Sequence, residues 1–232
     1  LVRHLRAASP EDTLRLLCWG DSPWENEAGI EVVQGDITDP AAVDAAAAGV
    51  DEIYHLAGFV SRNPRDAEKL HAVHVQGSRN MCEAALRNGA KKMVAVSSSG
   101  TIAVSRDAVV HNEESGYKDA ISGRWPYYAS KIRAEREVLR FFEERQLPVV
   151  VVNPALILGP GDVFGSSTGD VRLFIEGRIP SIPPGGACFV DARDCAAGLI
   201  AAMRRGRLGE RYLLGGVNWT FKELAGHIAS LC

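Results

Sequence analysis

The sequence lacks a closely spaced cysteine pair, a long apolar run and a marked excess of one charge. Its five cysteines are scattered, which indicates neither a zinc site nor a disulfide framework and suits a reducing cytoplasm. No apolar run approaches the roughly 20 residues of a membrane helix, and the first residues lack a signal-peptide pattern. The net charge of -3 offers no basic excess for nucleic acid. We therefore expect a soluble cytoplasmic protein that binds neither membrane nor nucleic acid.

Short apolar runs alternate with amphipathic stretches along the first two thirds of the chain. The 232 residues, 46% of them hydrophobic, can bury the core of one enzyme-sized domain with a small appended lobe. The apolar runs predict strands at residues 14–19, 30–33, 52–56, 92–97 and 148–153. Helical patterns cover residues 40–48, 66–87 and 127–145. The alternation predicts an α/β fold with a doubly wound, Rossmann-type parallel sheet.

The composition of the chain changes after residue 154. Loops rich in Gly, Pro and Ser at 159–169 and 180–186 come before a predicted helix at 193–204 and a short strand at 212–214. We predict a dinucleotide-binding core at residues 1–154 and a smaller substrate-binding lobe at 155–232. Residues 1–7 already have a helical pattern, so the first strand and glycine-rich loop of such a domain are not in the sequence. We expect a portion of a longer enzyme, with an incomplete lobe.

Tyr127 and Lys131 stand four residues apart at the start of a helical stretch, which places both side chains on one helix face. An ammonium beside a phenol favours the phenolate, so the pair could lower the tyrosine pKa toward that of a general acid or base. Upstream, the predicted strand at 92–97 leads into a run of serines that ends at Ser99. Hydroxyls at the carboxyl end of a parallel strand are placed to meet a ligand. Each pattern alone is also explained by an ordinary helix face or a capping turn.

Several segments, in order, resemble the extended short-chain dehydrogenase/reductase family, in its NAD-dependent epimerase/dehydratase group and its dihydroflavonol-reductase-like branch. The matching segments are Val33-Gln34-Gly35-Asp36-Ile37, His55-Leu56-Ala57-Gly58, Ser97-Ser98-Ser99, Tyr127-x-x-x-Lys131, Asn153-Pro154-Ala155-Leu156-Ile157-Leu158-Gly159-Pro160 and Phe189-Val190-Asp191-Ala192-Arg193-Asp194. The resemblance covers nearly the whole chain.

The resemblance implies roles for the matching residues. Tyr127 would exchange a proton with the substrate oxygen, Lys131 would hold the nicotinamide ribose, and Ser99 would orient the substrate, with no metal required. The cofactor would be bound by Asp36, Ile37, Leu56, Ala57, Gly58, Val96, Ser97, Tyr127, Lys131, Pro154, Ala155 and Leu156. The substrate would be contacted by Phe59, Ser99, Gly100, Thr101 and Asn153. Family members often pair the helices at 66–87 and 127–145 across a dimer axis, so we expect a homodimer.

Three positions depart from the family pattern or divide its branches. Cys18-Trp19-Gly20-Asp21 stands where an acid or an arginine would select the cofactor, so the sequence leaves NAD and NADP open. His74 replaces an asparagine, and we slightly favour a space-filling role over a hydrogen-bonding one. Asn153 followed by proline resembles the dihydroflavonol-reductase side of the family more than the sugar-nucleotide epimerases.

Three functions are compatible with these residues. The first is an NAD(P)-dependent oxidoreductase that reduces a ketone or aldehyde by hydride transfer with Tyr127 as general acid or base. The second is a sugar-nucleotide epimerase or dehydratase with bound NAD. The third is a non-catalytic NAD(P)-binding regulatory protein, which the intact Ser99, Tyr127 and Lys131 set argues against.

Overall fold

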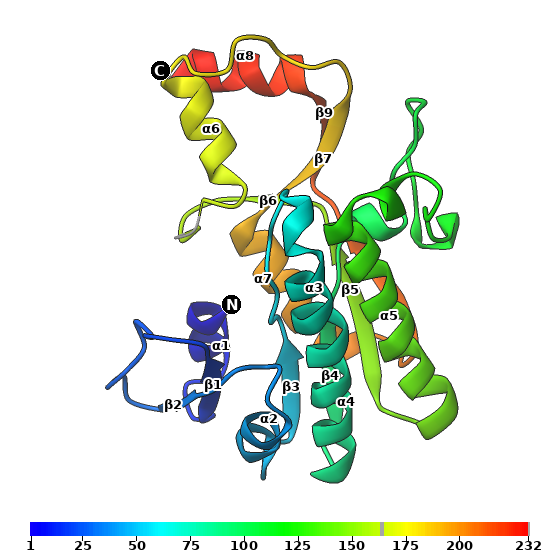
Figure 1. Cartoon of the computed structure of the whole chain (residues 1–232). Helices are drawn as coiled ribbons and strands as arrows, with labels where there is room; N and C mark the ends of the chain where they lie inside the picture. Colours follow the sequence, from blue (N-terminus) through cyan, green and yellow to red (C-terminus); the bar gives the residue numbers. More distant parts are fainter. Residues whose placement is uncertain (163–164, 232) are drawn as a thin grey trace.

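The centre of the molecule is a four-stranded parallel sheet, as the computed structural model of the chain shows for residues 1–162 and 165–231 (Figure 1). Its strands lie in the order β3 (Glu52–His55), β4 (Lys92–Val96), β5 (Val149–Pro154) and β8 (Arg211–Leu214). The strands predicted at 52–56, 92–97, 148–153 and 212–214 are confirmed to within a residue or two at each end.

Helices cover both faces of this sheet. One face carries α3 (Ala67–His71), η2 (Ala72–Gln76), α4 (Gly77–Arg87) and α5 (Pro126–Arg145), and the other carries α7 (Ala192–Arg205). Alternate residues of β5 serve the two cores: Val149 and Val151 pack in the cluster that contains α4 and α5, whereas Val150 and Val152 pack in the cluster that contains α7. The doubly wound α/β fold is thereby confirmed.

A second parallel sheet pairs β1 (Leu14–Cys18) with β2 (Ile30–Gln34). Two helices accompany it, α1 (Val2–Ala8), which contacts α7, and α2 (Pro40–Ala47), which contacts both β1 and α4. The Asp39 side chain caps α2 by accepting from Ala41 N, and Pro40 opens its first turn. Within the described residues this pair of strands makes no ladder with the four-stranded sheet.

A smaller lobe rises above the carboxyl ends of the central strands (Figure 1). Its sheet joins β6 (Leu156–Leu158), β7 (Gly186–Asp191) and β9 (Val217–Thr220), and its helices are α6 (Thr168–Ile175) and α8 (Phe221–Leu231). Apart from α7 and β8, the elements after residue 154 were not predicted, because their segments are short and rich in Gly and Pro. Between β7 and β9 the chain returns to the core of the molecule. There α7 packs on β4 and β5, and β8 adds a strand to the central sheet.

Four short 3-10 turns complete the elements: η1 (Pro64–Asp66), η3 (Ser99–Thr101), η4 (Glu113–Ser115) and η5 (Ser122–Arg124). Of these, η3 follows β4 directly and η5 ends just before α5. Over residues 1–162 and 165–231, the structure contains no helix that is both long enough and apolar enough to cross a membrane.

Candidate active site

The first turns of α5 present Tyr127 and Lys131 toward the end of β4. Lys131 is buried, at 8% exposure, and its Nζ donates to the Val96 carbonyl oxygen at 3.2 Å. Burial lowers the pKa of Lys131 to about 8, and the Glu135 carboxylate opposes this shift. The lysine thus lies inside the molecule at the point where β4 ends.

The Tyr127 hydroxyl lies in an apolar environment that disfavours its anion. Burial raises the pKa of Tyr127 to about 12, the neighbouring Tyr128 adds to this, and a hydrogen bond with the Ser98 side chain acts in the opposite direction. Lys131 is not among these causes, so the expectation that the lysine lowers the tyrosine pKa is wrong for this structure. A phenol of this kind is a proton donor rather than a phenolate.

Ser98 and Ser99 lie at the N-terminus of η3, just after the end of β4. Ser98 precedes η3 with extended backbone and caps it, its Oγ accepting from Gly100 N at 3.3 Å. Ser99 starts the 3-10 turn, and its carbonyl oxygen accepts from the amides of Ile102 and Ala103. The assignment of the substrate-orienting hydroxyl to Ser99 stays a prediction.

His74 makes two hydrogen bonds from the π-helical turn η2. Its Nε2 accepts from the Phe59 backbone N–H at 3.0 Å, and its Nδ1 lies 2.8 Å from Ser130 Oγ. Because Nε2 accepts, Nδ1 carries the proton and donates to Ser130, whose hydroxyl donates to the Tyr127 carbonyl oxygen at 2.7 Å. The favoured space-filling role of His74 is wrong: the side chain links the loop after β3 to the first turn of α5.

Glu135 is a buried hub one helical turn below Lys131. Its Oε2 accepts from Ser97 Oγ at 2.5 Å, Thr101 Oγ1 at 3.1 Å and Asn153 Nδ2 at 2.8 Å. These three donors come from the end of β4, from η3 and from β5, so one carboxylate ties together the segments around the tyrosine. The sequence analysis missed this residue, although its position four residues after Lys131 placed it on the same helix face.

An arginine balances this carboxylate from β8. Arg211 Nη1 lies 3.3 Å from Glu135 Oε1, and the Glu135 side chain has no exposed area. The Arg211 guanidinium also stacks over the Tyr117 ring at 4.6 Å and donates to the Tyr117 hydroxyl at 3.2 Å. A buried charge with partners of this kind is costly to disrupt.

Three of the residues predicted to contact substrate are turned inward. Thr101 and Asn153 have no exposed area, and the Asn153 amide donates to Ser98 O, Thr101 Oγ1 and Glu135. Gly100 is covered by Tyr128, because an added Cβ would lie 2.1 Å from Tyr128 Cε1. These three residues support the position of Ser98 instead of facing a ligand, which corrects the prediction. Phe59 is half-buried, with the Lys69 ammonium 4.2 Å from its ring centroid.

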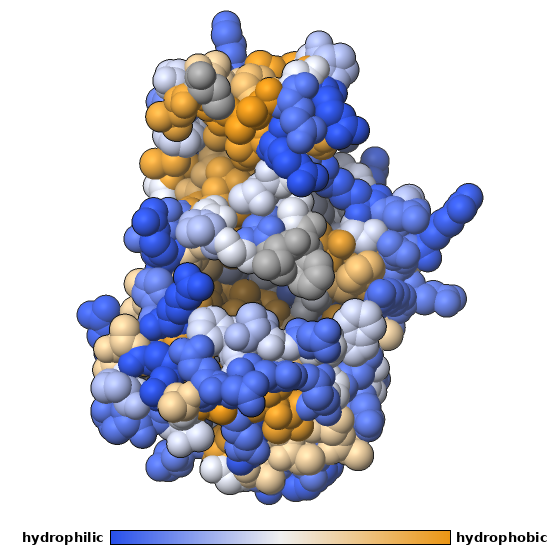
Figure 2. All heavy atoms as spheres, turned by 90° about the vertical axis from the view of Figure 1, so that its left-hand side faces the viewer, coloured by the Kyte–Doolittle hydropathy of each residue, from blue (hydrophilic) through white to orange (hydrophobic). Residues whose placement is uncertain are grey.

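The residues predicted to bind cofactor lie at the carboxyl ends of four parallel strands. Asp36 and Ile37 follow β2, and Leu56, Ala57 and Gly58 follow β3. Val96 ends β4 and Ser97 follows it, while Pro154 ends β5, Ala155 follows it and Leu156 begins β6. Ile37 is buried against Gly77, whereas Leu56 and Leu156 are 45% and 39% exposed. Figure 2 shows that this side of the molecule is hollowed between the sheet-bearing part and the upper lobe. Parallel sheets bind ligands at such an edge.

Comparison with known proteins places the chain in a family. The model of the NAD-dependent epimerase/dehydratase family matches residues 3–215. Sterol demethylase protein B of Methylococcus capsulatus is 34% identical over 85% of the chain and 62% of its own length. The Synechocystis protein named "Putative dihydroflavonol 4-reductase" is 29% identical over 100% of the chain and 68% of its own length.

A solved structure agrees with this placement. The crystal structure of gox2253 superposes with a TM-score of 0.88 at 31% identity, over 99% of the chain and 69% of that protein. The chain thus spans about two thirds of the length of these relatives. Together with the ordered motifs along the sheet edge, these matches show that the chain belongs to the NAD-dependent epimerase/dehydratase family.

Proposed function

We propose that this protein is an NAD(P)-dependent oxidoreductase that reduces a ketone or aldehyde. The observation that carries the proposal is the grouping of Tyr127 and the buried Lys131 ammonium with the serine run that ends at Ser99, at the carboxyl edge of a parallel sheet. A carbonyl oxygen that receives a proton from Tyr127 would be held by the hydroxyl of Ser99. The protein contributes position and proton transfer.

The residues present fit a bound NAD(P). Lys131 offers ammonium N–H donors of the kind that ribose hydroxyls accept. Gly58 lies next to it, since a Cβ added to Gly58 would be 3.6 Å from Lys131 Nζ, an ordinary contact distance. When bound, the nicotinamide supplies or accepts the hydride. Lys131 would hold the ribose through these ammonium donors.

The rim of the site supports an apolar carbonyl substrate over a nucleotide sugar. Leu56, Val60 and Leu156 are 45%, 53% and 39% exposed, and pockets for small ligands are lined mostly by apolar side chains. The relative named as a dihydroflavonol 4-reductase points the same way. A sugar-nucleotide epimerase or dehydratase with bound NAD is the second candidate, on the strength of the family model.

Turnover by the full-length protein distinguishes the candidates. Consumption of NADPH or NADH with ketones or aldehydes supports the reductase, whereas tightly co-purified NAD with interconversion of UDP-sugars supports the epimerase. Tyr127→Phe should abolish turnover and leave cofactor affinity largely intact, because only the transferable proton is removed. A wild-type rate in this variant would contradict the proposed role of Tyr127, and cofactor binding without turnover on any substrate would indicate a regulatory protein.

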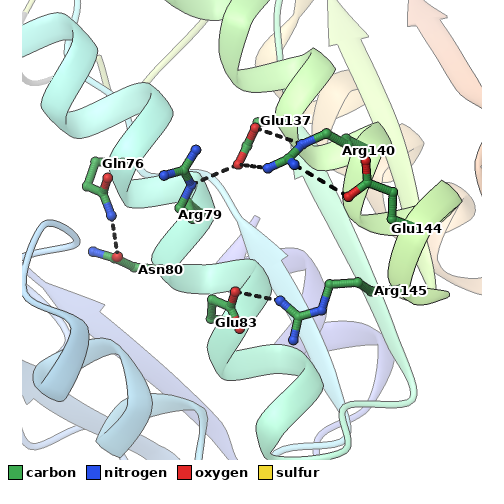
Figure 3. A network of polar contacts seen from close by, with 8 residues as sticks. All are labelled: Gln76, Arg79, Asn80, Glu83, Glu137, Arg140, Glu144 and Arg145. Atoms are coloured by element: carbon green, nitrogen blue, oxygen red, sulfur yellow. Dashed lines mark hydrogen bonds and ion pairs between the residues drawn. The ribbon is translucent and has the colours of Figure 1, made fainter.

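The outer face of α4 and α5 is the surface on which we propose that two copies meet. Ion pairs join the two helices, with Arg79 to Glu137 at 2.8 Å and Arg145 to Glu83 at 2.5 Å, while Arg140 contacts Glu137 at 2.7 Å (Figure 3). These contacts hold both helices as one unit with a regular charged surface. Analytical ultracentrifugation tests the proposal: Arg79→Glu with Arg145→Glu should shift a dimer to monomer, and a monomeric wild type would overturn it.

We also propose that residues 1–154 bind the dinucleotide and that residues of 155–232 form the substrate lobe of a cytoplasmic enzyme. The return of α7 and β8 to the central sheet suggests that the lobe proper consists of β6, α6, β7, β9 and α8. Limited proteolysis with and without cofactor would test this division.

A further inference from the structure

A small cavity of about 20 Å³ lies behind Lys131, between α5 and the central sheet. Alanines and valines form its apolar walls, and its polar walls are formed by His55, His74, Ser78, Ser97, Lys131 and Glu135. One water molecule needs roughly 10 to 15 Å³ and two to four polar partners. The cavity therefore has the size and the walls of a site for a single water, and it is too small for a ribose.

His55, the last residue of β3, has a ring nitrogen without a partner. The side chain is buried, at 5% exposure, and its Nε2 lies 2.9 Å from Ser78 Oγ. Its Nδ1 is buried and has no hydrogen-bond partner among residues 1–162 and 165–231. Burial and the Lys131 charge lower the pKa of His55 to about 4, so the ring is neutral at pH 7. With Nε2–H donating to Ser78, Nδ1 is an acceptor, the tautomer that a nearby ammonium favours.

Lys131 has more hydrogen-bond donors than acceptors have been found for it among the described residues. Its ammonium carries three N–H donors, and Val96 O is the one acceptor found for it among the described residues. The titratable groups that face it are His55 from β3, His74 from η2, and Tyr127 and Glu135 from α5.

The other acceptors around the lysine have partners. Both nitrogens of His74 are engaged, by Phe59 N and Ser130 Oγ. In the Glu135 carboxylate, Oε2 receives three side-chain donors, whereas Oε1 has no hydrogen bond among the described residues and lies 3.3 Å from Arg211 Nη1. Because Glu135 Oε1 is paired with the Arg211 charge, His55 Nδ1 is the acceptor of the cavity wall that is left without any partner among the described residues.

We propose that the cavity binds one ordered water that accepts from Lys131 Nζ and donates to His55 Nδ1, which makes His55 a positioning residue for the lysine. The water occupies one inner N–H of the ammonium, so that another is left to point outward toward the site. The role of this arrangement in catalysis rests on the proposed function of Lys131, whereas the presence of the water does not.

High-resolution crystal structures of the full-length protein test the water itself. Wild type and His55→Gln, whose side-chain carbonyl can accept, should show one ordered water between residue 55 and Lys131. His55→Leu removes the acceptor, and Ala134→Val fills the cavity while keeping both His55 and Lys131, so both variants should lose the water. A wild-type cavity without a water, or an unchanged water in His55→Leu, would overturn the proposal. These readouts do not depend on turnover.

The alkaline limb of the kcat against pH profile tests the consequence. Without the water the ammonium loses an acceptor, so Ala134→Val and His55→Leu should move this limb down by about half a pH unit or more, with His55→Gln close to wild type. Ala84→Val adds the same two methyl groups in the core away from the cavity and should leave the limb in place. If His55→Leu does not fold, Ala134→Val alone tests the positioning role. An alkaline limb at the wild-type pH in that variant would refute the role.

Discussion

The imidazole of His74 accepts a hydrogen bond from the backbone N–H of Phe59 at 3.0 Å and, through Nδ1 and Ser130, links the loop after β3 to the helix that carries Tyr127. This acceptor role requires an unprotonated Nε2. Burial and the Lys131 charge, followed by that of His55, lower the pKa of His74 to about 3, so the contact persists in mildly acidic solution.

Two buried neutral histidines make the protein sensitive to acid. The pKa values of His74 and His55 are about 3 and 4 in the folded protein and near 6.5 in the unfolded chain. Between these values the unfolded chain binds protons that the folded protein does not. Their contribution is fully present above pH 6.5 and is lost as the pH falls toward 4, at about 3 kcal/mol for each histidine. Urea unfolding at several pH values should show this slope, and it should become shallower in His74→Gln; an unchanged slope would contradict the assignment.

The two adjacent serines should differ in their effect on catalysis. Ser99→Ala removes the hydroxyl that the family resemblance assigns to the substrate oxygen, and it should lower kcat on the order of 10²-fold, the usual effect of losing one donor at a reacting oxygen. Ser98→Ala should have the smaller effect, because Ser98 Oγ accepts from Gly100 N and caps η3. The reverse order of effects in steady-state kinetics would assign the substrate-orienting role to Ser98.

The part of the site that follows from helix geometry was predictable, and the part that depends on turns was not. The spacing of Tyr127 and Lys131 determines a shared face on any helix. Which serine caps η3 depends on where that turn begins, and a run of identical residues carries no signal for that. His74 reaches Phe59 from a π-helical turn, which periodicity does not reveal. The burial of Glu135 depends on donors from β4, η3, β5 and β8, which only the assembled sheet brings together.

Glu135 should be far less tolerant of replacement than other acids of α5. Glu135→Ala removes a buried carboxylate and leaves Arg211 and three side-chain donors without their acceptor. We expect a loss of roughly 3 kcal/mol or more in the free energy of unfolding. Glu144→Ala on the exposed part of the same helix should cost less than about 1 kcal/mol, as expected for surface pairs. Equal losses for the two variants in urea unfolding would contradict the hub role.

The buried ammonium of Lys131 should lower the free energy of unfolding, although the proposed function requires it. Burial lowers its pKa to about 8 from 10.5, which corresponds to about 3 kcal/mol against the charged form at neutral pH. Lys131→Met keeps the length of the side chain and removes the charge, while the Val96 carbonyl loses a donor worth about 1 kcal/mol. The variant should therefore be about 1 to 2 kcal/mol more stable than wild type at pH 7, and it should bind cofactor weakly and turn over poorly.

The pH dependence gives the same variant a second signature. Between about pH 8 and 10.5 the unfolded chain holds a proton on residue 131 that the folded protein has released, so wild-type stability from this group rises with pH over that window. Lys131→Met should lack this rise, and Lys69→Met, which alters an exposed lysine, should retain it. Urea unfolding at pH 7 provides the check. If Lys131→Met is less stable than wild type, the ammonium stabilises the fold, which contradicts the predicted cost of burying its charge.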